Sequence, residues 1–185
     1  MTADVLAATR EKMEKSVQAL RQELAGVRAG RANPALLEKI RVEYYGTATP
    51  LQQIGSITAP DPRTLAIQVW DRGAVPAVEK AIQRSDLGLT PQTEGNVVRL
   101  VLPQPSAERR AELVKHARRI GEEQRIAIRN LRREAREQLE RQEKAGEIAG
   151  DEAKRGGDEL QKITDRAMAQ VGQLVEAKER EISEV

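Results

Sequence analysis

Residues 106–144 decide the fold, and they read SAERRAELVKHARRIGEEQRIAIRNLRREAREQLERQEK. Apolar residues recur mostly three, four or seven positions apart, as one buried stripe along a helix requires. These residues are Leu113, Ala117, Ile120, Ala127, Leu131, Ala135 and Leu139. Nearly all the other positions are charged. The pattern predicts a single helix on the order of 60 Å long, with one side buried.

The same stretch carries ten arginines and only two lysines. At about 100° per residue, five arginines share one side of the helix, about 120° from the centre of the apolar stripe. We call this set the arginine ridge; it comprises Arg118, Arg125, Arg129, Arg132 and Arg136. Neighbours four residues apart, such as Arg125 and Arg129, have like charge, which destabilises a helix. A merely solvated face would alternate charges, as residues 137–144 do, so the ridge is predicted to bind a polyanion.

The charge distribution limits where such a surface can lie. The whole chain has a net charge of +2, but residues 106–145 hold twelve basic and eight acidic groups, while residues 146–185 hold six and ten. The polyanion-binding surface is therefore expected on and beside the long helix, with the acidic segment alongside it or facing elsewhere.

Several classes of protein are excluded by what the sequence lacks. There is no cysteine, which removes disulfides, thiolate zinc sites and cysteine nucleophiles. The first residues carry neither a secretory signal nor an organellar transit pattern, and no stretch has the apolar length of a membrane span. These features predict a soluble, cytoplasmic protein that does not bind membranes.

Two further segments have helical patterns. Residues 3–28 repeat apolar side chains as a heptad seam, at Leu6, Met13, Val17, Leu20, Leu24 and Val27. Residues 151–185 do the same at Leu160, Ile163, Ala167, Val171, Leu174 and Ile182. The five-residue link at 146–150 predicts that this last helix lies antiparallel to the 106–144 helix. Gly156 and Gly157 are expected to weaken it, because glycine costs about 1 kcal/mol in a helix interior.

The segment from Ala32 to Pro105 has a different character, with fewer charges and all three aromatic residues. Alternating or β-rich runs predict strands at 40–45, 47–51, 54–59, 64–70 and 97–102, with turns at Gly46 and at 60–62. A short helix is expected around 75–82. The chain is thus predicted to be an α+β protein of two domains. A long antiparallel three-helix bundle (1–30 and 106–185) carries a small inserted α/β domain (31–105), and the two connections act as a hinge at Arg31, Ala32, Gln104 and Pro105.

No pattern of catalytic or metal-binding residues stands out. His116 is the only histidine and has no second metal-binding residue nearby, and the Gly26 and Gly30 pair does not have the spacing of a phosphate-binding loop. Tyr44, Tyr45 and Trp70 are interpreted as core or sheet packing rather than as a base-stacking platform. We therefore expect no enzyme activity, no metal and no cofactor.

Several motifs together resemble bacterial ribosome recycling factors. They are VRAGRANP at 27–34, VEYYGTATPL at 42–51, AVEKAI at 77–82, SDLGL at 85–89, ERR at 108–110 and RNLRR at 129–133. The resemblance covers essentially the whole chain in order; the glycine pair at 156–157 departs from the pattern expected of the family.

The resemblance implies an elongated, near L-shaped monomer that mimics transfer RNA, with a mobile α/β domain. Such factors bind the large ribosomal subunit after termination and, with elongation factor G and GTP, split the ribosome into subunits. The residues matching the family's RNA-facing positions are Arg28, Arg31, Arg110, Arg129, Arg132 and Arg133, with Arg118, Arg125 and Arg136 as secondary candidates. The alternative is a helical adaptor that acts through protein–protein contacts, which leaves the like-charged ridge unexplained.

Overall fold

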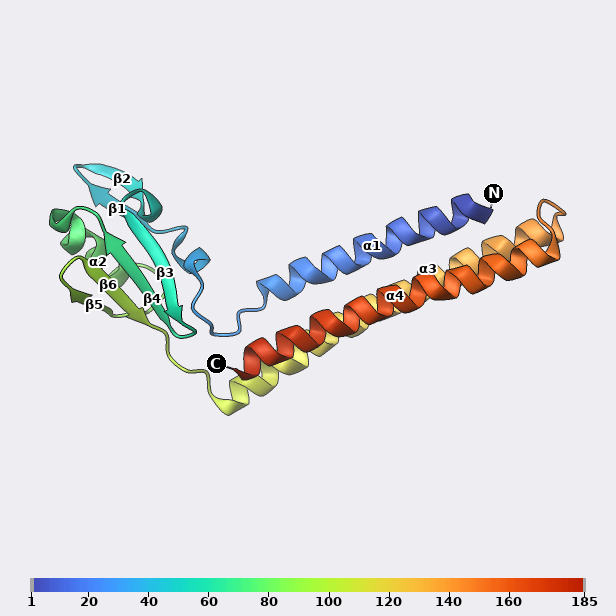
Figure 1. Cartoon of the computed structure of the whole chain (residues 1–185). Coiled ribbons are helices and arrows are strands. Elements are labelled where there is room, and N and C mark those ends of the chain that lie inside the picture. The colour runs from blue at the N-terminus through green and yellow to red at the C-terminus, as the bar shows by residue number, and fades with distance from the viewer. Residues whose placement is uncertain (1, 185) are drawn as a thin grey trace. The chain divides into compact units, whose positions relative to one another are not determined.

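The computed structural model describes residues 2–184 and divides the chain into two compact units (Figure 1). One unit comprises the N-terminal segment up to Arg28 together with Glu108–Glu184, and the other comprises Ala29–Ala107. Three long helices form the first unit: α1 (Thr2–Gly26), α3 (Ala107–Lys144) and α4 (Gly150–Ser183). The predicted α+β class, with three long helices and an inserted antiparallel sheet, is confirmed.

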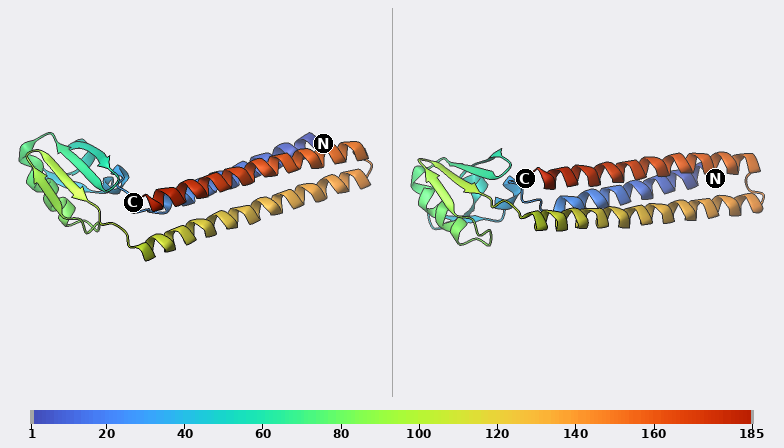
Figure 2. Two further views of the ribbon diagram at one scale, coloured as in Figure 1. Left: turned by 60° about the horizontal axis from the view of Figure 1, so that its bottom comes forward. Right: turned by 90° about the horizontal axis from the view of Figure 1, so that it is seen from below.

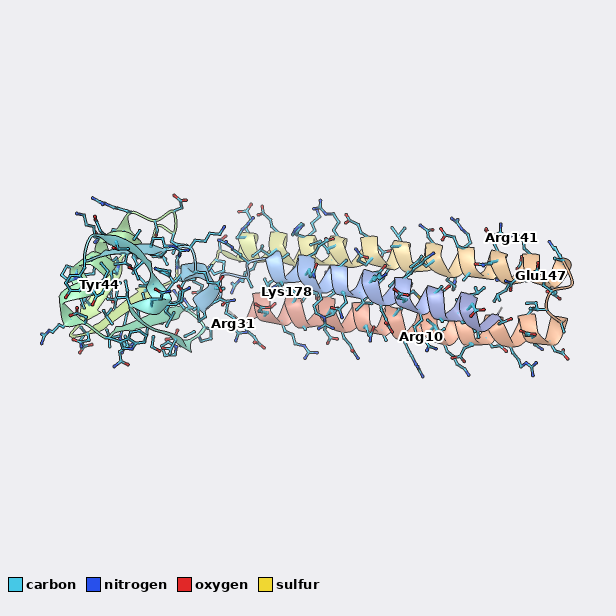
Figure 3. All side chains as sticks on the ribbon, turned by 90° about the horizontal axis from the view of Figure 1, so that it is seen from above. Arg10, Arg31, Tyr44, Arg141, Glu147 and Lys178 are labelled. Atoms are coloured by element: carbon cyan, nitrogen blue, oxygen red, sulfur yellow. The ribbon has the colours of Figure 1, made fainter. Side chains whose placement is uncertain are left out.

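The three helices lie side by side, with α3 antiparallel to both α1 and α4 (Figure 2). A contact at one end of the unit fixes the register of α1 and α4. The Thr2 hydroxyl donates to Glu152 Oε1 at 2.7 Å, which aligns the start of α1 with the start of α4. Figure 3 places Arg141 and Glu147 at this same end of the unit.

The buried stripe of α3 differs from the predicted one in the middle of the helix. Leu113, Ala117, Ile120, Ala135 and Leu139 are buried as expected, but Ala127 and Leu131 are only half-buried. Gly121 and Ile128 are buried in their place. A similar exchange occurs in α4, where Val175 is buried and Leu174 is half-buried, and in α1, where Val5 is buried and Leu6 is half-buried.

Gly121 explains the shift in α3. A β-carbon added at this position would lie 2.5 Å from Val175 Cγ2, closer than carbon atoms approach each other. The backbone of α3 therefore lies against the Val175 side chain of α4 at a residue that a hydropathy pattern does not count as apolar. Gly121 is buried by this contact.

The glycine pair in α4 does not interrupt the helix, which runs unbroken through both positions. Gly156 is buried, and a β-carbon there would lie 2.9 Å from Thr2 Cγ2 and 3.2 Å from Leu139 Cδ1. Gly157 has open space around it. The first glycine thus allows three helices to meet closely, and the expected weakness does not appear as a break.

The second unit is an antiparallel α/β fold. Its strands are β1 (Arg41–Tyr44), β2 (Thr47–Pro50), β3 (Gly55–Asp61), β4 (Thr64–Val69), β5 (Pro91–Glu94) and β6 (Val97–Val101). A β1–β2 hairpin stands apart from a four-stranded sheet of order β3-β4-β6-β5. Helix α2 (Val75–Gln83) and three short 3₁₀ helices, η1 (Pro34–Leu37), η2 (Leu51–Gln53) and η3 (Arg72–Ala74), complete the unit.

One core holds this unit together. It includes Leu65 and Ile67 of β4, Val98 and Leu100 of β6, and Ile82 of α2, all with no exposed surface. The predicted strands are confirmed, but β5 was not predicted. The turn predicted at 60–62 is partly wrong: β3 continues to Asp61, with an irregularity in its pairing between Thr58 and Asp61. No helix within residues 2–184 is long and apolar enough to cross a membrane.

The close approach of α3 to α4 predicts opposite effects for two glycine substitutions. Gly121→Ala should lower the free energy of unfolding of the helical unit by about 1–3 kcal/mol, because the added methyl group overlaps Val175. Gly172→Ala, in a part of α4 with open space, should instead raise it by up to about 1 kcal/mol. Denaturant unfolding followed by circular dichroism measures both; equal effects of the two variants would contradict the assigned contact.

Candidate nucleic-acid interface

The arginine ridge lies at the edge of α3 that borders α4. Because Gly121 and Ile128 belong to the buried stripe, the ridge is about 90° from the centre of that stripe, rather than the predicted 120° or so. Arg118, Arg129 and Arg136 are exposed, but Arg125 and Arg132 are half-buried. The prediction of a uniformly exposed ridge is therefore wrong for these two residues.

Two ridge arginines bond directly to α4. The Arg118 guanidinium donates to both carboxylate oxygens of Glu179, from Nε at 2.5 Å and from Nη2 at 3.2 Å. Arg132 Nη1 donates to Gln161 Oε1 at 3.3 Å. The Arg118 hydrogen bond lowers the pKa of Glu179 and, by the same pairing, raises that of Arg118 itself. Arg118 thus has a structural role between helices.

The remaining ridge arginines pair with acids on α3. Glu122 accepts from Arg129 Nη1 at 3.0 Å and from Arg125 Nη1 at 3.4 Å, and these bonds, with Arg129 the stronger influence, lower the pKa of Glu122. Arg136 Nε donates to Glu140 Oε1 at 3.1 Å. The like-charged neighbours seen in the sequence are therefore compensated by acids outside the run from Arg125 to Arg136.

The six primary candidate residues do not form a single cluster. Arg129, Arg132 and Arg133 lie within little more than one turn of α3, whereas Arg110 is about 28 Å earlier along the helix axis. Arg28 follows the C-terminal end of α1, in the helical unit. Arg31 belongs to the α/β unit. The middle of α3 is thus where the candidate residues are most concentrated.

Sequence reasoning missed the contribution of α4. A groove between α3 and α4 is lined by Arg132 and Arg136 together with Lys154, Gly157 and Gln161 of α4. From the net acidic charge of α4 we expected this helix either beside the polyanion surface or facing elsewhere, and the groove has it beside the ridge. The antiparallel register, readable from the short 146–150 link, would have aligned Gln161 with Arg132.

The aromatic residues are less buried than predicted. Tyr45 is 85% exposed and Trp70 is 65% exposed, so the interpretation as core packing is wrong for both. Tyr44 is half-buried; its hydroxyl donates to Asp71 Oδ2 at 2.9 Å, and this bond raises the pKa of Tyr44. None of the three lies on α3, the helix that carries the arginine ridge.

His116 is exposed, and its Nδ1 lies 3.0 Å from Arg119 Nη2. Among residues 2–184, no three His, Asp or Glu side chains are grouped so that they could hold a metal ion.

Comparison with known proteins gives a consistent family. Residues 20–182 match the family described as "Ribosome recycling factor". The chain is 51% identical to the ribosome-recycling factor of Symbiobacterium thermophilum and 52% identical to that of Heliobacterium modesticaldum, in both cases over 185 residues and the full length of each protein.

Comparison with solved structures finds the same family. A solution structure of a ribosome recycling factor superposes with a TM-score of 0.68 at 44% identity, covering 100% of this chain and 98% of the other. A second match has a TM-score of 0.61 at 49% identity and covers 98% of each chain. It comes from models of the T. thermophilus ribosome recycling factor and the E. coli elongation factor G bound to the E. coli post-termination complex.

The pair between Arg118 and Glu179 predicts a specific pH dependence. The pairing lowers the folded-state pKa of Glu179 from its ordinary value of 4.5. The pair therefore contributes its full stabilisation at pH values above 4.5, and this stabilisation is lost as the pH falls through the lowered pKa. Glu179→Gln should lower the melting temperature of the helical unit at neutral pH, and the difference from the original chain should shrink on acidification. A difference that stays constant down to about pH 2 would contradict a charge-dependent role.

Proposed function

This chain belongs to the ribosome recycling factor family, and on that premise we propose that it acts with elongation factor G on the post-termination ribosome and splits it into subunits. The observation that carries the proposal is the match of about half of all residues over the full length of curated relatives, without a missing segment. The family comprises translation factors rather than enzymes. We therefore expect the chain to act by binding the ribosome and changing the relative position of its two units, in the cytoplasm and as a monomer.

The arginines of the helical unit, together with Arg31 of the α/β unit, bind ribosomal RNA of the large subunit. The primary contacts are Arg28, Arg31, Arg110, Arg129, Arg132 and Arg133. The guanidinium group suits this role because its planar fork binds phosphate oxygens in pairs and stacks on unpaired bases. The ion pairs of Arg129 with Glu122 and of Arg133 with Glu137 are exposed, and exposed pairs contribute little to stability, so phosphates can replace these carboxylates at low cost.

The contacts rank the three secondary candidates among themselves. Arg118 is held by two bonds to Glu179 on another helix, so RNA binding there would loosen the packing of α3 on α4. Arg125 has a side chain only 29% exposed and donates to Glu122. Arg136 is 75% exposed and pairs with Glu140 one turn away, which leaves it the most available of the three.

The hinge is proposed to lie in the two connections between the units. Ala32 N donates to Pro62 O at 2.7 Å, and Leu102 N donates to Arg63 O at 2.7 Å, which ties both residues to the α/β unit. These bonds favour pivots at residues 28–31 and 103–106. Of the predicted hinge residues, Arg31, Gln104 and Pro105 remain, and Ala32 moves to the edge of the rigid part. Gly30 has a φ of 75°, a conformation that glycine adopts without strain.

Subunit splitting tests the proposed function. Post-termination ribosomes mixed with the chain, elongation factor G and GTP should lose light scattering as the subunits separate. Arg132→Ala and Arg129→Ala should each weaken binding to isolated large subunits by about tenfold, because one guanidinium–phosphate contact is lost. Binding should also weaken steeply with increasing salt.

A matched control distinguishes contact loss from charge loss. Arg119 is exposed on α3, about 110° around the helix from the ridge, so Arg119→Ala removes the same charge while leaving the ridge intact. Arg119→Ala should change the affinity for isolated large subunits by no more than about twofold. Equal losses for Arg119→Ala and Arg132→Ala, or losses that follow a fall in helix content, would contradict the assigned interface. Salt-insensitive binding to a protein would favour the adaptor alternative.

Relative motion of the units tests the hinge. The chain has no cysteine, so Gln92→Cys and Gln138→Cys provide one exposed dye site in each unit without background labelling. Single-molecule energy transfer should report a broad distribution of distances in the free chain and a narrower one on the large subunit. One narrow, unchanged distance in both states would rule out a functional hinge.

A further inference from the structure

Glu122 occupies an unusual position among the acids of α3. Both oxygens of its carboxylate accept from ridge arginines, Oε1 from Arg129 and Oε2 from Arg125. Arg129 is seven residues further along the helix, about 10 Å of axial rise, so the Arg129 and Glu122 side chains reach toward each other along the α3 surface. The charge of Arg129 thus lies along the helix, next to the Glu122 carboxylate.

Because Glu122 and Arg129 are exposed, another anion can take the place of the Glu122 carboxylate. Side chains of Glu122 and Arg129 are 50% and 49% exposed, so water and ions reach the pair from outside. The pair between Arg118 and Glu179 differs, because it joins two helices and the Glu179 side chain is only 25% exposed. Replacing Glu179 would disturb helix packing, whereas replacing Glu122 changes only which anion the two arginines bind.

We propose that Glu122 limits the RNA affinity of the ridge: its carboxylate competes with RNA phosphates for Arg125 and Arg129, so that an RNA held by few other contacts is bound only weakly. The inference rests on the proposed function only where large ribosomal subunits serve as one of the RNA ligands. A carboxylate that presents two acceptor oxygens resembles the pair of oxygens on a phosphate, and both suit the guanidinium fork.

The competition costs every RNA that binds Arg125 and Arg129 the same free energy. A folded RNA whose shape is complementary to the helical unit makes many other contacts and stays bound despite this cost. An arbitrary duplex contacts the ridge through phosphates alone, so the same cost leaves little of it bound.

The test compares Glu122→Gln with Glu123→Gln. Both remove one negative charge at the same level of α3, but Glu123 lies about 150° around the helix from the ridge. Affinities are measured at low salt for a generic RNA duplex and for purified large ribosomal subunits. Glu122→Gln should tighten duplex binding and subunit binding alike, each by about threefold or more beyond the effect of Glu123→Gln, because both RNAs must displace the same carboxylate.

A double variant shows whether Arg129 carries the effect. In an Arg129→Ala background, most of the gain from Glu122→Gln should disappear, because the competing carboxylate has lost its principal partner. Equal gains for both glutamine variants, or a gain that persists in full without Arg129, would overturn the inference. If the unaltered chain fails to bind large subunits, the proposed function fails, while the duplex measurements still decide the role of Glu122.

Discussion

The close approach of α3 to α4 at Gly121 and Val175 is the constraint on which the helical unit depends. A β-carbon at Gly121 would lie 2.5 Å from Val175 Cγ2, so the α3 backbone can lie against this side chain only because the residue is glycine. The contact puts one side of α3 against α4. The arginine ridge therefore lies beside α4, where Glu179 and Gln161 can reach it.

This placement separates two uses of the same residue type. Arg118 connects helices, whereas Arg129, Arg133 and Arg136 interact with acids of their own helix, at Glu122, Glu137 and Glu140. The first kind of pair is part of the packing. The second kind neutralises the ridge until another anion replaces the carboxylates, which suits a surface that must bind a polyanion and then leave it. A run of like charges in a sequence is thus compatible with a folded surface whose charges are locally balanced.

The sequence was sufficient for the architecture because long apolar repeats have only one way of being buried. The bounds of α3 and α4 and the strands of the inserted unit followed from periodicity and turn residues. Periodicity failed where burial depends on a neighbour: Gly121 is buried because of Val175, and no property of Gly121 alone indicates it. For the same reason Gly156 and Gly157 look identical in the sequence, although only the first faces Thr2 and Leu139.

Strand β5 was missed because Pro91–Glu94 has no apolar alternation and is specified by pairing with β6. Family-matching motifs, rather than periodicity, ranked Arg129, Arg132 and Arg133 above the other arginines.

Stability and binding can vary independently in this design. The helical unit is held by apolar residues and by close contacts at glycines, whereas the arginines proposed to bind RNA lie at its edge and contribute little to its core. An exposed arginine that exchanges a carboxylate for a phosphate needs no rearrangement of the backbone, because the helix presents both partners from a fixed position. With the hinge we propose, binding energy would go into moving one unit relative to the other rather than into ordering the protein. Two compact units joined by two short connections fit that proposal, because each unit can keep its own core while the connections change conformation.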